Sequence, residues 1–150
     1  MICSDMVVAS PTATFGLPEA LRGIYAGAGG LPRLVRNVGL PLASEISMAA
    51  RTLSAKEALQ FQLINHISSS QETCVPEAVK LAAKVADISP DSIVITRAAL
   101  RETWESSSIE RAFQNIEDRM KRGLMESENS KEGLTAFREK RKPVWKASKL

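Results

Sequence analysis

A glutamate and a cluster of glycines near the front of the chain are the residues best suited by type and spacing to chemistry. Glu19 follows Pro18 in a Phe-Gly-Leu-Pro-Glu turn, and this order is typical of a helix start. A carboxyl group in an apolar pocket can give or take a proton near neutral pH. From its position alone, Glu19 is more simply an acid that the helix dipole favours.

The glycines that follow suit a close approach of a ligand to the backbone. Three glycines, Gly27, Gly29 and Gly30, stand within four positions, which disfavours a helix interior. A helix is predicted over residues 31–38, so the glycines lie at its N-terminus, where free N–H groups and the positive end of the dipole meet. The alternative for Gly27 is a simple helix-start glycine.

The cysteines and the single histidine do not suggest a further site. Cys3 and Cys74 are far apart and unpatterned, so we predict reduced thiols and neither a disulfide nor a metal site. His66 has no nucleophile or acid at a recognisable spacing and is predicted to be structural.

The composition is that of one soluble globular domain. The 150 residues are 44% hydrophobic and 25% charged, and no apolar run approaches the roughly 20 residues of a membrane helix. We therefore expect no membrane association and no secretory signal. The net charge of +3 is mild, and the basic residues near the C-terminus lack the interleaved aromatics of a nucleic-acid site.

These candidates need elements to position them, and the patterns predict short strands at the front and helices thereafter. Strands are expected over residues 2–9, 12–15 and 63–67. Ser54 and Glu57 match a capping box, and Ser130 is expected to cap the last helix. Helices are predicted over residues 31–38, 41–49, 54–61, 75–88, 92–105, 109–124 and 132–141.

Several motifs together resemble the C-terminal half of the enoyl-CoA hydratase/isomerase (crotonase) superfamily, over almost the whole chain. The motifs are Cys3-x-Asp5-Met6-Val7, Ala13-Thr14-Phe15-Gly16-Leu17-Pro18-Glu19, Gly23-Ile24-x-x-Gly27-Ala28-Gly29-Gly30-Leu31-x-Arg33-Leu34, Leu53-Ser54-Ala55-x-Glu57-Ala58 with Leu63-Ile64-Asn65, and Ser127-Glu128-x-x-Lys131-Glu132-Gly133-x-x-Ala136-Phe137-x-Glu139-Lys140-Arg141-Lys142-Pro143. The resemblance implies an α+β fold, mostly helical here. It places part of a ββα-spiral core at residues 1–67, a helical trimerisation region at 68–147 and a targeting tripeptide at 148–150.

The resemblance also implies roles for individual residues. Glu19 matches the family's second catalytic glutamate, and Gly27 matches a glycine whose N–H helps to orient the reacting water. Phe137 and Lys140 match residues that contact the adenine and the 3′-phosphate of coenzyme A, often from a neighbouring subunit. The alternative is a core position for Phe137 and a solvated basic tail. The substrate is an acyl-CoA thioester, and no resident cofactor is expected.

Parts of the family's site have no counterpart in this chain. The segments that supply the two oxyanion-hole N–H groups and the first catalytic glutamate in hydratases are absent, and Tyr25-Ala26 stand where Ile-Pro is frequent. Losing one oxyanion donor typically costs about 10²–10³ in rate. The chain is therefore expected to be truncated and weakly active or inactive alone. Exposed strand edges favour an oligomer or a poorly soluble monomer, and the resemblance implies a trimer or a dimer of trimers.

The last three residues resemble a peroxisomal import signal. Ser148, Lys149 and Leu150 end the chain, and a Ser-Lys-Leu terminus is read by an import receptor. The resemblance thus predicts a peroxisomal enzyme of fatty-acid oxidation or, as an alternative, of a secondary-metabolite (toxin) pathway. A further alternative is a non-catalytic truncated paralogue that associates with full-length subunits.

Overall fold

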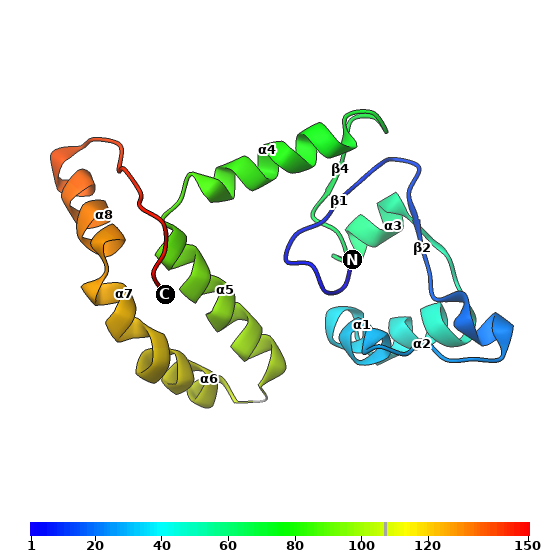
Figure 1. Ribbon diagram of the computed structural model, residues 1–150. Coiled ribbons are helices and arrows are strands. Elements are labelled where there is room, and N and C mark those ends of the chain that lie inside the picture. Colours follow the sequence, from blue (N-terminus) through cyan, green and yellow to red (C-terminus); the bar gives the residue numbers. More distant parts are fainter. Residues whose placement is uncertain (107) are drawn as a thin grey trace. The chain divides into compact units, whose positions relative to one another are not determined.

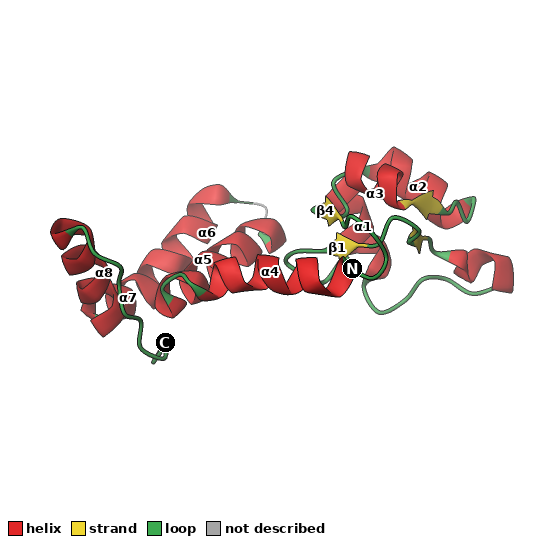
Figure 2. Cartoon of the chain, turned by 90° about the horizontal axis from the view of Figure 1, so that it is seen from above, coloured by secondary structure: helices red, strands yellow, loops and turns green. Residues whose placement is uncertain are grey.

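The computed structural model describes residues 1–106 and 108–150, which fall into two compact units, Met1–Leu81 and Ala82–Leu150. Helices are the main regular structure of both units, and the strands are short (Figure 2). Helix α4 (Cys74–Ala86) begins in the first unit and ends in the second. No helix within the described residues is long and apolar enough to cross a membrane.

The strands of the first unit form two separate pairs. β1 (Val8–Ala9) lies parallel to β4 (His66–Ile67), and β2 (Thr14–Phe15) lies antiparallel to β3 (Leu53–Ser54) (Figure 1). β1, β2 and β4 are shorter than the strands predicted there, and β3 was not predicted. Asn65 explains part of the difference at β1, because its side-chain Oδ1 accepts the Val7 N–H at 2.7 Å in place of a backbone carbonyl. At the start of the chain, a turn replaces the predicted strand.

Four helices complete the first unit around an aliphatic core. They are the 3₁₀ helix η1 (Pro18–Arg22), α1 (Gly30–Val38), α2 (Leu40–Met48) and α3 (Ala55–Gln60). Gly39 separates α1 from α2 with a φ of 78°, a backbone region that favours glycine. The buried core consists of Ala9, Leu34, Ala43, Ile46, Leu53, Ala58, Leu63 and Ile64.

The predicted capping box at the start of α3 is confirmed. Ser54 Oγ accepts the Glu57 N–H at 3.3 Å, and Glu57 Oε2 accepts the Ser54 N–H at 2.8 Å. Arg51 adds an ion pair to Glu57 Oε1 at 2.6 Å. The hydrogen bonds from Ser54, followed by the one from Arg51, lower the pKa of Glu57 to about 2. The cap and the arginine together join the loop after α2 to the start of α3.

The second unit is a series of helices followed by an extended segment. The helices are α5 (Pro90–Glu105), α6 (Ile109–Ile116), a π-helical turn η2 (Glu117–Lys121), α7 (Arg122–Glu126) and α8 (Glu128–Glu139). The π-helical turn interrupts the single helix predicted over 109–124. It therefore shifts the phase of the apolar stripe between α6 and α7.

Serine side chains begin three of these helices. Ser89 caps α5, Ser108 caps α6 and Ser127 caps α8, each by accepting the N–H of the third residue onward. The prediction that Ser130 caps the last helix is wrong. Ser127 has the extended backbone of an N-cap and accepts the Ser130 N–H at 3.0 Å, so α8 begins before the predicted start.

Candidate active site

The short helix η1 positions Glu19. Its start has Pro18 in the first turn and no side-chain cap, and Gly23, with a φ of 71°, ends it. The Ile24 N–H then donates to the Glu19 carbonyl oxygen at 3.3 Å. The Glu19 side chain is half-buried, and its Oε2 is buried without a hydrogen-bond partner among the described residues. A buried carboxylate oxygen without a partner is free to bind a water molecule or exchange a proton.

The glycine turn before α1 places the amide of Gly27 at the surface. Gly27 is exposed, and its carbonyl oxygen accepts the Gly30 N–H at 3.1 Å. Ala28 and Gly29 have φ values of 53° and 76°, so the chain reverses here before α1 begins. Within the part of the chain that the structure describes, no protein acceptor takes the Gly27 N–H. That amide is therefore available to a ligand.

Gly29, in contrast, serves the chain itself. Arg33 Nη1 donates to the Gly29 carbonyl oxygen at 3.1 Å. A Cβ atom at position 29 would lie 2.2 Å from that nitrogen, so any side chain there would displace the guanidinium. Of the three glycines that the sequence singled out, Gly29 is thus explained by folding.

An apolar cavity adjoins the turn that carries Glu19. Its volume is about 290 Å³, and Phe15, Gly16 and Leu17 form part of its wall. The remainder of the wall is mostly aliphatic and includes the core residues Leu34, Ile46, Leu53 and Leu63. Glu19 itself does not line the cavity, but the chain passes from the cavity wall to the carboxylate within the same turn.

Phe137 and Lys140 lie together at the C-terminal end of α8, in the second unit. The Phe137 side chain is 85% exposed, which excludes the core position considered as an alternative. Lys140 is exposed and ends the helix with a left-handed φ of 54°, and its N–H donates to the Phe137 carbonyl oxygen at 3.3 Å. The helix end therefore carries an exposed aromatic side chain and an exposed cation three residues apart, the types of side chain that contact with a base and a phosphate requires.

The three C-terminal residues also belong to the second unit. Lys149 Nζ forms an ion pair with Glu128 Oε1 at 2.9 Å, and the Leu150 N–H donates to Ser148 Oγ at 3.2 Å. The structure thus groups Glu19 with Gly27 in one unit, and Phe137 and Lys140 with residues 148–150 in the other.

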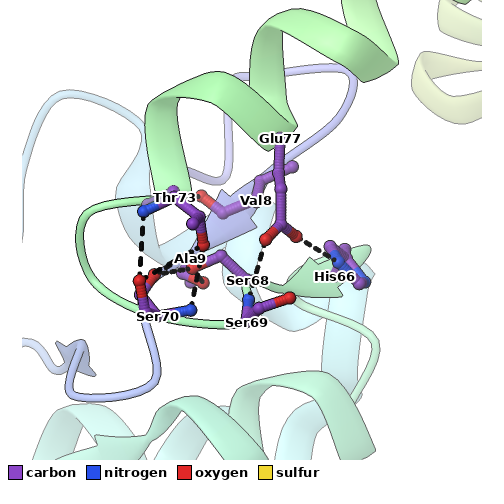
Figure 3. A network of polar contacts seen from close by, with 9 residues as sticks. Val8, Ala9, His66, Ser68, Ser69, Ser70, Thr73 and Glu77 are labelled. Carbon is purple, nitrogen blue, oxygen red and sulfur yellow. Dashed lines mark hydrogen bonds and ion pairs between the residues drawn. The ribbon is translucent and has the colours of Figure 1, made fainter.

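Sequence reasoning missed a polar network between β4 and α4 (Figure 3). His66 has an acid partner after all, since its Nε2 lies 2.9 Å from Glu77 Oε2, and Glu77 Oε1 accepts the Ser69 N–H at 2.9 Å. The Ser69 amide, followed by Thr73 and His66, lowers the pKa of Glu77 to about 2. Ser68 Oγ donates to the Ala9 carbonyl oxygen at 3.3 Å.

This network joins the β1–β4 pair to the first turn of α4 and therefore has a structural role. The signal in the sequence was weak, because His66 and Glu77 are separated by a loop of serines and a helix start. Among the described residues, no group of three or more His, Cys, Asp or Glu side chains is arranged to hold a metal ion.

Comparison with known protein families gives one match over nearly the whole chain. Residues 1–148 match the family described as enoyl-CoA hydratase/isomerase. The mevalonyl-coenzyme A hydratase of Beauveria bassiana is 43% identical over 99% of this chain, and that of Aspergillus fumigatus is 44% identical over 97%. This chain covers 53% and 54% of those proteins. It therefore spans about half the length of the curated relatives it matches.

Solved structures give the same result. An enoyl-CoA hydratase from Mycobacterium tuberculosis superposes with a TM-score of 0.90 and 30% identity, over 98% of this chain and 57% of its own. An enoyl-CoA hydratase from Bacillus anthracis gives a TM-score of 0.90 and 28% identity, over 98% of this chain and 56% of its own. The arrangement described above is that of one half of these proteins.

Proposed function

The chain belongs to the enoyl-CoA hydratase/isomerase family, and from this premise we propose that it forms the Glu19-bearing half of an acyl-CoA hydratase. The observation that carries the proposal is the buried Oε2 of Glu19, which has no partner among the described residues. An unpaired buried carboxylate oxygen costs free energy. A catalytic role explains why this oxygen is buried without a partner.

The proposed reaction adds water across, or removes it from, a double bond conjugated to the thioester. In the hydration direction, a C–O bond forms at the β-carbon and a C–H bond at the α-carbon. Glu19 exchanges the proton with the α-carbon or with the reacting water, and the free Gly27 N–H orients that water. Water and the thioester supply every atom that moves, so the proposed reaction requires no resident cofactor.

The proposed substrate class follows the relatives of highest identity among those described above. Two fungal proteins at 43% and 44% identity are mevalonyl-coenzyme A hydratases. We therefore propose a 3-hydroxyacyl-CoA of the mevalonyl type, in secondary rather than fatty-acid metabolism. Phe137 and Lys140 are proposed to hold the adenine and the 3′-phosphate, because both side chains are exposed at the same helix end.

The test measures hydration of crotonyl-CoA, and dehydration of mevalonyl-CoA, by the chain alone and by the chain co-expressed with the remaining part of the Beauveria bassiana relative. We expect little turnover alone and measurable turnover in the pair. In the pair, Glu19→Gln should reduce kcat by at least about 100-fold. Glu45→Gln makes the same charge change at an exposed position of the same unit and should leave kcat within about twofold.

Either of two results would contradict the proposal. One is turnover by the chain alone at the level of the pair. The other is equal activity of the Glu19→Gln and Glu45→Gln pairs, because Glu19 would then not transfer the proton.

We further propose that residues 148–150 direct the protein to peroxisomes through an import receptor. A Ser-Lys-Leu C-terminus is the tripeptide such receptors read. The chain fused behind a fluorescent protein should locate to peroxisomes, and the same fusion lacking Leu150 should not. An unchanged distribution after removal of Leu150 would exclude the tripeptide as the address.

Exposed apolar side chains favour a second candidate function, that of a non-catalytic subunit joined to full-length relatives or to copies of itself. In the second unit, Ile109, Phe113, Leu134 and Phe137 are 73%, 63%, 60% and 85% exposed. Apolar surface of this kind typically marks an interface. Light scattering that finds only monomers of the chain, alone and when mixed with a full-length relative, would exclude both this function and the trimer.

A further inference from the structure

The last nine residues, here called the tail (residues 142–150), are held along the second unit by specific contacts. Asn129 pairs with the tail backbone at Lys146 in both directions, donating from Nδ2 to its carbonyl oxygen at 3.0 Å and accepting its N–H at 2.8 Å. Glu132 Oε1 accepts the Val144 N–H at 2.8 Å. These side chains hold the tail through its backbone groups, independently of the tail's own side chains.

Two large tail side chains pack where the helices carry glycine. Trp145 Nε1 donates to the Asp87 carbonyl oxygen at 2.9 Å, and a Cβ atom at Gly133 would lie 3.2 Å from its ring. A Cβ atom at Gly123 would lie 2.8 Å from Leu150 Cδ2. The absence of a side chain at each glycine thus makes room for the tail.

Charged groups bind the end of the tail. Glu128 forms ion pairs with both Lys146 and Lys149. Asp91 is only 2% exposed, and its Oδ2 accepts a hydrogen bond from Asn129 Nδ2 at 2.9 Å. Oδ1 is also buried and has no partner of standard hydrogen-bond geometry among the described residues. The Ser148 hydroxyl is the largest of the influences that lower the pKa of Asp91, and burial opposes them.

We propose that α5, α7 and α8 form a binding site for the chain's own tail, and that docking there limits the access of other proteins to residues 148–150. A partner that grips the C-terminus must bind the Lys149 ammonium and the Leu150 side chain, which Glu128 and Gly123 already contact. Docking of the tail on the helices and binding of the tail by a partner therefore exclude each other, because both use the same side chains. This competition exists whether or not the tripeptide is a peroxisomal address.

The tail can leave its binding site while the helices stay folded. A cavity of about 240 Å³ lies between the tail and the helices, with Asp91, Gly123 and Ser127 in its wall. The tail is thus bound through its backbone, a few ion pairs and two side chains instead of through a continuous apolar core. Release of such a segment requires far less than global unfolding.

Carboxypeptidase Y is a suitable probe, because it must take hold of the C-terminal residue to remove it. The release of Leu150 from the whole chain is followed by mass spectrometry and compared with its release from a synthetic peptide of residues 142–150. We expect the chain to lose Leu150 at least tenfold more slowly than the peptide. Equal rates would overturn the proposal.

Two variants and a control separate docking from general stability. Glu128→Gln removes the ion-pair partner of Lys146 and Lys149. Lys146→Met weakens the binding of the tail to the helices and leaves residues 148–150 unchanged. Each should speed the release of Leu150 by at least threefold while far-UV circular dichroism at the assay temperature stays unchanged. Glu117→Gln, which breaks an ion pair with Lys121 that includes no tail residue, should leave the rate unchanged. Equal rates for all three variants would also overturn the proposal.

Discussion

The two units bury different kinds of side chain. In the first unit, the buried cluster is aliphatic, from Ala9 to Ile64. In the second, the buried side chains among the described residues are two alanines, Ala112 and Ala136, and the polar Ser89, Asp91 and Asn129. Apolar burial therefore stabilises the unit that carries Glu19, whereas hydrogen bonds shape the unit that carries the tail.

The largest expected effect tests the aliphatic side of this comparison. Leu53 is 1% exposed at the centre of the first unit, and Leu53→Ala should lower the free energy of unfolding by about 2–5 kcal/mol. Urea denaturation followed by circular dichroism measures the change. In the second unit, Ala112→Gly should cost only about 1 kcal/mol. A smaller loss of stability for Leu53→Ala than for Ala112→Gly would contradict the conclusion that apolar burial stabilises mainly the first unit.

The next effect tests the polar side. Asn129→Leu keeps the size of the side chain but leaves the backbone of Lys146 and one oxygen of Asp91 without their partner. Buried groups left unpaired should cost about 1–3 kcal/mol. Asn115→Leu is the matched control, because Asn115 makes one hydrogen bond, to Glu102. An Asn129 variant as stable as the Asn115 variant would mean that hydrogen bonds do not define the second unit.

Acid should weaken both units through similar carboxylates. Hydrogen bonds from Ser54 lower the pKa of Glu57 to about 2, and Arg141 lowers that of Glu132 to about 2, from an ordinary value of 4.5. Because these pKa values fall on folding, the stabilisation is complete above pH 4.5 and is lost as the pH falls towards 2.

The melting temperature between pH 5 and pH 2.5 measures this loss. Glu57→Gln and Glu132→Gln should each start lower at pH 5 and lose fewer degrees on acidification than the parent chain. If only one variant flattens the profile, the acid sensitivity belongs to one unit, and the comparison becomes sharper.

The smallest effect concerns exposed ion pairs along the helices of the second unit. Arg122 and Glu126 pair at 2.9 Å, with side chains 87% and 66% exposed. Pairs of this kind on a helix surface contribute only about 0.3–0.5 kcal/mol. Arg122→Gln should therefore shift the urea midpoint very little, and added salt should remove even that shift. If Arg122→Gln lost as much stability as Asn129→Leu, exposed ion pairs would be a main source of stability in the second unit.

Local patterns predicted much of the fold. The family and its mostly helical α+β fold class are confirmed, and so is the capping box of Ser54 and Glu57, because its residues lie within one helical turn. The predicted strands were too long, because alternating apolar residues cannot show that the Asn65 side chain, and not a backbone carbonyl, accepts the Val7 N–H.

Polar pairs distant in sequence could not be predicted. Asp91 lies between the helices predicted over 75–88 and 92–105, and no pattern shows that it is buried against Asn129, 38 residues away. His66 and Glu77 likewise meet only because β4 and α4 fold together. For the candidate site, the motif gave the identity of Glu19, whereas the buried and unpartnered state of its Oε2 required the structure. The roles of Glu19, Gly27, Phe137 and Lys140 stay predictions.

The contact between Gly29 and Arg33 makes the effects of mutation at these two positions interdependent. A residue with a side chain at position 29 is strained by the φ of 76°. While Arg33 is present, that side chain also displaces the Arg33 guanidinium from the carbonyl oxygen of residue 29. Once Arg33 has been replaced, only the strain is left. The same substitution at 29 is thus more harmful in one genetic background than in another, and sequence drift through this loop is easier when position 33 changes first.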